Sequence, residues 1–548
     1  MKRRHFLRSA ALAFGAAAAS PLRAIDFNAY PNSFPLFSTG EYRRIDSAER
    51  VFHRSASAAW LVNDPEQARA WYDAGVRHIW LTLMHHGRPD APSDVFDKAV
   101  RITRELGMVP HLLSVPLGHP APYTEGSGSP GWRPNERYSG HKGWGISTHP
   151  PVDRETVESN RFVFEKFGVC DHFLDDDYRC ADTPEEVGGC VCPECRRAFI
   201  QKAGISPSRW DELLADLKQN NDTPLLRLWV DYQCDILTDL FRKTEAAAPQ
   251  VDLGIMVMGM GSERAGIRLD DYRGKLFRVG EWMFNDGEYD QLKKKTIEMF
   301  SVLFHRRFTP PGRAFSETTI HPPKSLSKEN MASKLVFSTF ADVRNTMFMC
   351  ETPADYWPFF ARRMKQEAAF HEVLKGCAPR GPFKHFWGKA ARYLAGYSAY
   401  SLFLAAGVPF EVCDQLPADG WTFLGENDAR SLDRGEIASG GTVCITRKPI
   451  ASNRSVPVEE EMEQLFAFRR ALLPEFEKSR IPYVEEETPV VCGWYPDARA
   501  VLLWNPEKTA KTVHLCFAGR RTPAELAPLD SALMLENGDG TYREMRIA

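Results

Sequence analysis

The chain has 548 residues, enough for several domains at roughly 100–200 residues per domain. Lys and Arg number 69 against 72 Asp and Glu, and the formal net charge is -3. This balance lacks the basic surplus typical of nucleic-acid-binding proteins, so no nucleic-acid partner is expected.

The first 24 residues have the pattern of an export signal. A basic start is followed by an Ala-rich apolar run and by small residues before position 25. The pair Arg3-Arg4 ahead of Phe6-Leu7 is similar to a twin-arginine signal. The alternative is a basic amphipathic N-terminus without targeting value. No later stretch reaches the ~18–20 uninterrupted apolar residues of a membrane span, so the sequence predicts a periplasmic or secreted protein.

From about residue 55 to 376, strand-like and helix-like segments alternate. The predicted strands are 57–62, 76–84, 108–117, a segment ending at Asp175–Asp177, 251–260, 276–284, 313–319 and 345–350. The predicted helices are 64–74, 95–106, 154–167, 225–247, 289–306, 331–341 and 356–374. Such alternation is typical of a (β/α)8 TIM barrel, which we assign to residues 25–378. A doubly wound open sheet is the alternative, but its Gly-rich first turn is absent.

The remaining chain predicts two smaller domains. Residues 379–486 contain a predicted helix, two strands and a charged helix, which indicate a small α/β domain; these segments are 390–406, 408–413, 441–446 and 459–478. Residues 487–548 contain strand-like runs separated by turn residues, which predict a small antiparallel β-domain; the runs are 490–494, 500–504 and 512–517.

Polar side chains follow several predicted strands at their carboxyl ends, where a (β/α)8 barrel builds its active site. The densest group is Asp175-Asp176-Asp177 after the fourth strand. Burying unpaired carboxylates costs several kcal/mol, so these three residues are expected in a solvated or functional cleft. The candidate substrate-binding residues are Asp175, Asp176, His85, His86, Glu281, Trp282, Trp144 and Glu351.

A cleft rich in carboxylates and aromatic rings suits cleavage of a glycosidic bond. One carboxylic acid protonates the leaving oxygen, while a second carboxylate attacks the anomeric carbon or activates water. Asp177 and Glu317, at the ends of the fourth and seventh strands, are the candidate pair. The structural alternatives are an Asp-rich turn that caps a helix or pairs with Arg179, and an ion pair between Glu317 and an arginine. Glu281 is the second candidate for the nucleophile.

Clustered thiols follow the fourth strand. Cys190-x-Cys192-x-x-Cys195 has the spacing of a metal knuckle, and Cys180 could complete a tetrahedral four-thiolate site. Four protein ligands leave no open position, so such a zinc ion would be structural. Free thiols, or a disulfide between Cys180 and Cys190, are the alternatives. No organic cofactor is predicted.

The stretch from Asp175-Asp176-Asp177-Tyr178 through the thiols to Arg196-Arg197-Ala198-Phe199 resembles glycoside hydrolase family 42, a family of β-galactosidase-like enzymes. That family has Asp-Asn-Glu-Tyr at the first motif, then Cys-x-Cys-x-x-Cys on a zinc-bearing loop. The resemblance implies a barrel, a flavodoxin-like trimerisation domain and a small β-domain. It also implies Asp177 as acid/base, Glu317 as nucleophile and a zinc ligand from an earlier loop, for which His141 and His149 are candidates.

Two departures from that family concern the first motif. Asp177 is one methylene shorter than the family's Glu, and a misplacement of about 1 Å can lower a rate on the order of a hundredfold. Asp176 replaces an amide that the resemblance implies would donate a hydrogen bond to the sugar 2-hydroxyl.

The function predicted from the sequence is an exported glycoside hydrolase that cleaves a β-glycosidic bond by a retaining mechanism. Its partner is an oligosaccharide or glycoside substrate, and the resemblance adds a homotrimer. One alternative is a non-catalytic carbohydrate-binding barrel, suggested by Asp177 in place of Glu. Another is a metal-dependent TIM-barrel hydrolase or isomerase that uses His85, His86 and the Asp175–Asp177 cluster.

Overall fold

The computed structural model describes residues 35–38, 40–117, 131–175, 178–181, 183, 185–280, 282–349, 352–396, 399–438, 440–451 and 455–547, apart from the side chains of 143–146. The predicted export signal, residues 1–24, lies outside these ranges. Across the described ranges, no helix combines the length and the apolar character needed to cross a membrane.

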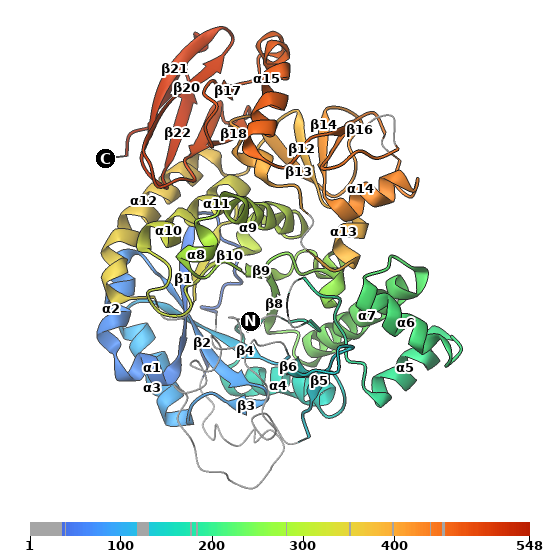
Figure 1. Ribbon diagram of the computed structural model, residues 1–548. Coiled ribbons are helices and arrows are strands. Elements are labelled where there is room, and N and C mark those ends of the chain that lie inside the picture. Colours follow the sequence, from blue (N-terminus) through green and yellow to red (C-terminus); the bar gives the residue numbers. More distant parts are fainter. Residues whose placement is uncertain are drawn as a thin grey trace.

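Eight parallel strands form a closed barrel (Figure 1). They are β1 (Val51–Ser57), β2 (His78–His85), β4 (Val109–Val115), β7 (Asp171–Leu174), β8 (Asp252–Met258), β9 (Leu276–Gly280), β10 (Ala314–Thr318) and β11 (Asn345–Phe348). The strand order is β1-β11-β10-β9-β8-β7-β4-β2, and β1 also pairs with β2, so the sheet closes on itself. The short strand β3 (Arg88–Pro89) pairs antiparallel with β2. The predicted (β/α)8 fold is confirmed.

The first predicted strand is wrong. The chain forms β1 over Val51–Ser57 and then the helix α1 (Ala58–Asn63), where a strand over 57–62 was expected. Ser57 caps this helix, because its hydroxyl accepts a hydrogen bond from the Trp60 backbone N–H. The charged Arg54 obscured the real strand. Its side chain is buried, donates to the Phe348 carbonyl and lies over the Trp60 and Trp71 rings.

Helices surround the barrel on the outside (Figure 1). Those between strands are α2 (Pro65–Ala74), α3 (Ser93–Glu105), α4 (Val152–Phe167), α7 (Pro224–Ala247), α8 (Asp286–Tyr289), α9 (Leu292–His305), α10 (Lys328–Ser333), α11 (Leu335–Ala341) and α12 (Trp357–Leu374). The helices α5 (Pro193–Ala203) and α6 (Arg209–Gln219) precede α7 and form a lobe beside the barrel. The hairpin of β5 (Pro134–Glu136) and β6 (Lys142–Ile146) follows β4.

The barrel interior is filled by apolar side chains that point inward from different strands. The cluster consists of Ile45, Trp80, Leu113, Phe173, Leu276, Phe315 and Met347. Because side chains alternate along a strand, residues two positions further on face the same interior, one layer nearer the carboxyl ends of the strands. The next inward positions after Phe173, Leu276 and Phe315 are therefore Asp175, Arg278 and Glu317.

The segment before β1 covers the opposite, amino end of the barrel. Asp252 at the start of β8 accepts two hydrogen bonds of 2.9 Å from Arg313 and one of 2.8 Å from Arg44. Arg313 also donates to the Ile45 carbonyl, at 3.0 Å. Tyr42 donates to Asp171, whose other oxygen contacts His111 at 3.0 Å. Ion pairs thus hold this segment against the strands.

After the barrel, a parallel sheet of β12 (Phe383–Phe386), β13 (Phe410–Cys413), β14 (Trp421–Leu424), β15 (Val443–Thr446) and β16 (Ser455–Pro457) forms a small α/β domain. Its order, β13-β12-β14-β15-β16, is the 2-1-3-4-5 order of flavodoxin-like folds. The helices α14 (Glu426–Asp433) and α15 (Met462–Ser479) belong to it.

The predicted helix over 390–406 is wrong: α13 spans Lys389–Tyr393, and a 3-10 turn spans Leu402–Ala405. Gly396, at φ +95°, adopts a left-handed conformation that no helix continues through.

The C-terminal residues form two antiparallel sheets, as predicted. The strands are β17 (Tyr483–Val484), β18 (Val491–Tyr495), β19 (Ala500–Trp504), β20 (Lys511–Phe517), β21 (Arg520–Leu526), β22 (Ser531–Glu536) and β23 (Tyr542–Glu544). This β-domain lies over α11 and α12 (Figure 1). The Trp504 ring meets Phe337 edge-on at 5.2 Å, and the Tyr495 hydroxyl donates to the Phe340 carbonyl.

Candidate active site

Three charged side chains meet inside the carboxyl end of the barrel. Arg278 of β9 lies between Asp175, which follows β7, and Glu317 of β10. Arg278 Nη2 is 2.5 Å from Asp175 Oδ1 and 3.5 Å from Glu317 Oε2. The three side chains are 0%, 1% and 7% exposed, in the order Arg278, Asp175, Glu317. The strands therefore bring two carboxylates and one guanidinium together in a nearly closed environment.

Asp175 lies in a different environment from the one expected. The sequence predicts a solvated or functional cleft for this residue, among the substrate-binding residues, because a buried unpaired carboxylate is costly. Asp175 is buried, but Arg278 supplies the opposite charge. Sequence reasoning missed Arg278, although an arginine inside the apolar run Leu276–Gly280 was the available signal.

The other nitrogen of the guanidinium contacts sulfur. Arg278 Nη1 donates to Met347 Sδ and Met349 Sδ, each at 2.9 Å. These thioethers come from β11 and its end, on the other side of β10. Because the two thioethers carry no charge, the ion pairs of Arg278 are those with Asp175 and Glu317.

Space for the Glu317 carboxylate depends on Gly280, the last residue of β9. A Cβ at this position would overlap Met256 Cε and lie 3.3 Å from Glu317 Oε2. A glycine therefore permits the close approach of β9 to the carboxylate.

The loop after β9 carries Trp282, which is half-buried and packs against the main apolar core. Glu298 of α9 accepts hydrogen bonds from the backbone N–H groups of Trp282 and Met283, at 2.9 and 2.5 Å. Lys334, itself buried, donates to the Met283 carbonyl and lies 3.3 Å from Glu298. A buried ion pair thus positions the backbone beside Trp282.

The end of β2 carries His85 and His86, whose rings lie 4.4 Å apart. His86 is buried and has a positive φ of 46°, whereas His85 is half-buried. The following hairpin holds Asp90, which sequence reasoning did not single out. Burial raises the pKa of Asp90 to about 6.

Several predicted site residues lie outside the described residues. These are Asp176, Asp177, Glu281 and Glu351, together with the side chain of Trp144.

Four side chains that could hold a metal ion gather from the segment after β7 and from another that precedes α4. His149, Cys190, Cys192 and Cys195 bring one ligand atom each to within 4.8 Å of one another. His149 Nε2 lies 3.0 Å from Cys192 Sγ and 3.2 Å from Cys195 Sγ. One imidazole and three thiols at this spacing fit a tetrahedral zinc site, whose ligand atoms are roughly 3.5 Å apart.

Cys180, predicted as the fourth ligand, does not belong to this group. Its place is taken by His149, one of the two histidines considered for a ligand from an earlier loop. Cys180 is instead buried, and its backbone bonds to Ala265 and Gly189. All cysteines that the structure describes are free thiols, so no disulfide joins Cys180 to Cys190.

The thiol loop connects three elements. Val191 N–H donates to the Glu136 carbonyl of the β5–β6 hairpin, and Arg137 donates to the Cys180 and Gly189 carbonyls. Trp229 of α7 donates to the Gly188 carbonyl, at 2.9 Å. The next residue has to be glycine, because a Cβ at Gly189 would lie 2.5 Å from the Trp229 ring.

A second metal-capable group lies on the C-terminal β-domain and consists of Glu485, Glu486 and His514. Arg521 pairs with Glu485, and His514 lies 2.7 Å from Glu486. His85 and His86 belong to neither group within the described residues.

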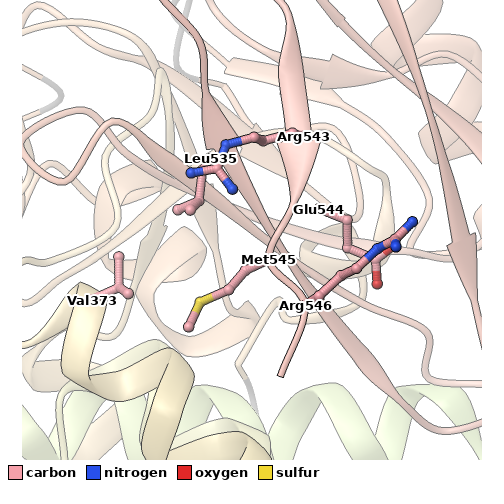
Figure 2. A pocket seen from close by; sticks show the side chains of 6 residues that line it. All are labelled: Val373, Leu535, Arg543, Glu544, Met545 and Arg546. Carbon is pink, nitrogen blue, oxygen red and sulfur yellow. The ribbon is translucent and has the colours of Figure 1, made fainter. Parts of the chain in front are cut away.

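A hollow of about 640 Å³ lies between α12 and the C-terminal tail (Figure 2). Figure 2 shows Val373 on the helix, Leu535, Arg543 and Glu544 on strands of the β-domain, and Met545 and Arg546 in the tail after β23. It shares no lining residue with the Asp175–Arg278–Glu317 group.

Solved structures similar to this chain include two β-galactosidases. The cold-adapted enzyme from Rahnella sp. R3 is similar with a TM-score of 0.58 at 10% identity, over 94% of this chain and 100% of that one. The enzyme from the psychrophilic Marinomonas ef1 is similar with a TM-score of 0.55 at 10% identity, over 88% and 99%. No family model and no curated protein sequence matches. At this identity, the likeness shows a shared fold along nearly the whole chain.

Proposed function

We propose that this protein is a glycoside hydrolase that cleaves a β-glycosidic bond with retention of configuration. The observation that carries the proposal is Glu317, a carboxylate at the carboxyl end of the seventh barrel strand, beside the buried Arg278. The fold shared with β-galactosidases along nearly the whole chain supports it. A β-galactoside is the first substrate to test, because of that likeness and the family resemblance of the strand-four motif.

In the proposed mechanism, Glu317 attacks the anomeric carbon and forms a glycosyl-enzyme intermediate. Asp177, which follows β7, protonates the leaving oxygen and then acts as the base that activates water. A nucleophilic carboxylate has to be ionised, and a positive charge within about 4–6 Å favours that form. Arg278 meets this requirement for Glu317.

The stereochemical outcome tests this mechanism. Aryl β-galactosides, β-glucosides, α-arabinosides and β-fucosides should be screened, and the anomer first released from the best substrate identified by proton NMR. We expect the β-anomer to be released first from a β-glycoside, before mutarotation mixes the two forms. Release of the α-anomer from a β-glycoside would contradict retention. Sugar binding without hydrolysis of any glycoside would support the carbohydrate-binding alternative.

A structural zinc ion held by His149, Cys190, Cys192 and Cys195 is part of the proposal. The donor set supports it, because three thiolates and one imidazole complete a tetrahedron with no open position. The bound ion would tie the loop after β7 to the segment after the β5–β6 hairpin. This would support the carboxyl end of β7, which Asp175 follows directly.

Metal analysis distinguishes the two ligand sets. We expect about one zinc per chain in the purified protein, and loss of most of it in Cys195→Ser. Cys180→Ser is the matched control and should retain the metal, because Cys180 lies outside the group. If Cys180→Ser loses zinc while His149→Asn keeps it, the four-thiolate set is the correct one.

Export through residues 1–24 by the twin-arginine route, and a homotrimer formed through the α/β domain, complete the proposal. The first is supported by the sequence pattern of those residues and the second by the family resemblance and the flavodoxin-like strand order.

A further inference from the structure

We infer that Arg278 is a positioning residue that keeps Glu317 ionised and in place, while Asp175 balances the arginine's charge. The inference rests on the proposed function, because it assigns Glu317 the nucleophile's role. It adds a residue on the sixth strand to the two carboxylates of the fourth and seventh.

The geometry distinguishes the two carboxylates. Asp175 Oδ1 lies 2.5 Å from Arg278 Nη2, whereas Glu317 Oε2 lies 3.5 Å from the same nitrogen. Both contacts are ion pairs, and the shorter one is with Asp175. Glu317 is therefore close enough for the positive charge of the guanidinium to favour its ionised form, while Asp175 forms the closer ion pair.

Among the described residues, two carboxylates pair with Arg278: Asp175, which follows β7, and Glu317 of β10. The contacts from β11 and the residue after it are with uncharged thioethers, those of Met347 and Met349. Acidic residues that follow the same strands, Asp176, Asp177, Glu281 and Glu351, lie outside the described residues.

The charge of the trio is consistent with the role. Two ionised carboxylates and one guanidinium carry a net charge of -1, which favours the positive charge that develops at the anomeric carbon in the transition state. Without Arg278, two buried carboxylates would repel each other, and the pKa of at least one would rise. The arginine therefore allows both to remain ionised in a nearly closed site.

The first experiment measures the pH dependence of kcat/KM on the best substrate. Arg278→Met keeps an apolar side chain compatible with the thioethers around it but removes the charge. We expect the acidic limb of the profile to move to higher pH by about 1–3 units, with a lower kcat. Arg278→Lys keeps a positive charge, so its acidic limb should stay within about one unit of the wild type. An unmoved limb in Arg278→Met would overturn the inference, because a purely structural role predicts no shift.

The second experiment does not need a substrate. Thermal midpoints of the wild type, Arg278→Met, Glu317→Gln and the double variant are compared at pH 5 and pH 8, as a double-mutant cycle. Without the arginine, the folded-state pKa of a buried carboxylate lies above its unfolded value, so its contribution to stability is lost as pH rises. We expect the midpoint of Arg278→Met, relative to wild type, to fall between pH 5 and pH 8.

Adding Glu317→Gln to Arg278→Met should reduce this fall in the thermal midpoint, because the carboxyl group that ionises between pH 5 and pH 8 is then absent. Identical pH dependence in Arg278→Met and the double variant would overturn the coupling of Arg278 to Glu317. If Arg278→Met does not fold, Arg278→Gln takes its place in the same cycle, with the same expected result and the same overturning result. If the wild type cleaves no glycoside but the cycle shows coupling, the proposed function fails and the charge arrangement stands.

Discussion

Glu317→Gln should lower kcat/KM for the best hydrolysed glycoside by on the order of 10³-fold or more, with little change in thermal stability. The amide has nearly the same shape as the carboxylate but has no charge with which to attack the anomeric carbon or stabilise an oxocarbenium-like transition state. Removal of a nucleophile from other enzymes lowers kcat by amounts up to about 10⁶-fold. Initial rates with an aryl glycoside at fixed pH measure the effect.

The matched control is Glu544→Gln, which makes the same chemical change on an exposed residue of β23 beside the hollow in Figure 2. It should leave kcat/KM within about twofold. Equal activity in Glu317→Gln and Glu544→Gln would mean that Glu317 is only the ion-pair partner of Arg278. Glu281 would then be the next candidate for the nucleophile.

Arg313→Met should destabilise the barrel by about 3–5 kcal/mol, the usual effect of removing one partner from a buried ion pair. Arg313 and Asp252 are each 7% exposed and joined by two hydrogen bonds of 2.9 Å, so the variant leaves a carboxylate in a poorly hydrated place. The substitution also removes donors to the Ile45 and Gly274 carbonyls. Differential scanning calorimetry should show a lower midpoint for the barrel transition.

Arg44→Met is the control for this prediction because it removes the other arginine on the same carboxylate. Arg44 is 58% exposed, and exposed pairs contribute about 0–1 kcal/mol. Its midpoint should therefore lie close to that of the wild type. If both variants lower the midpoint equally, the N-terminal segment, rather than burial of the pair, determines the stability of this end of the barrel.

The thiol loop illustrates what local sequence can predict. The Cys-x-Cys-x-x-Cys spacing identified three members of the metal-capable group, because ligands so near in sequence are held together by the loop itself. The fourth member depended on how the loop packs against a distant segment. Cys180 is closer in sequence, yet its backbone pairs with Ala265 and Gly189, and His149 approaches from another loop.

Errors in secondary structure had local causes. The buried strand β1 was not predicted because it contains the charged residue Arg54. The structure accommodates this charge through the Phe348 carbonyl and the Trp60 and Trp71 rings. The apolar run over 390–406 suggested one helix, but Gly396 takes a left-handed conformation whose N–H donates to the Glu185 carbonyl. In both cases, a tertiary contact outweighed the local pattern.

By itself, the sequence determined the alternation of strands and helices, and hence the barrel, since hydrophobic periodicity and turn residues act over a few positions. It also predicted that Glu317 lies near the carboxyl end of a barrel strand, which β10 confirms. Only the tertiary structure decided that Asp175 and Glu317 share Arg278, because β9 lies between their strands and contributes the guanidinium. Ion pairing between strands far apart in the chain depends on barrel closure and on which side chains point inward, and neither is visible in a local pattern.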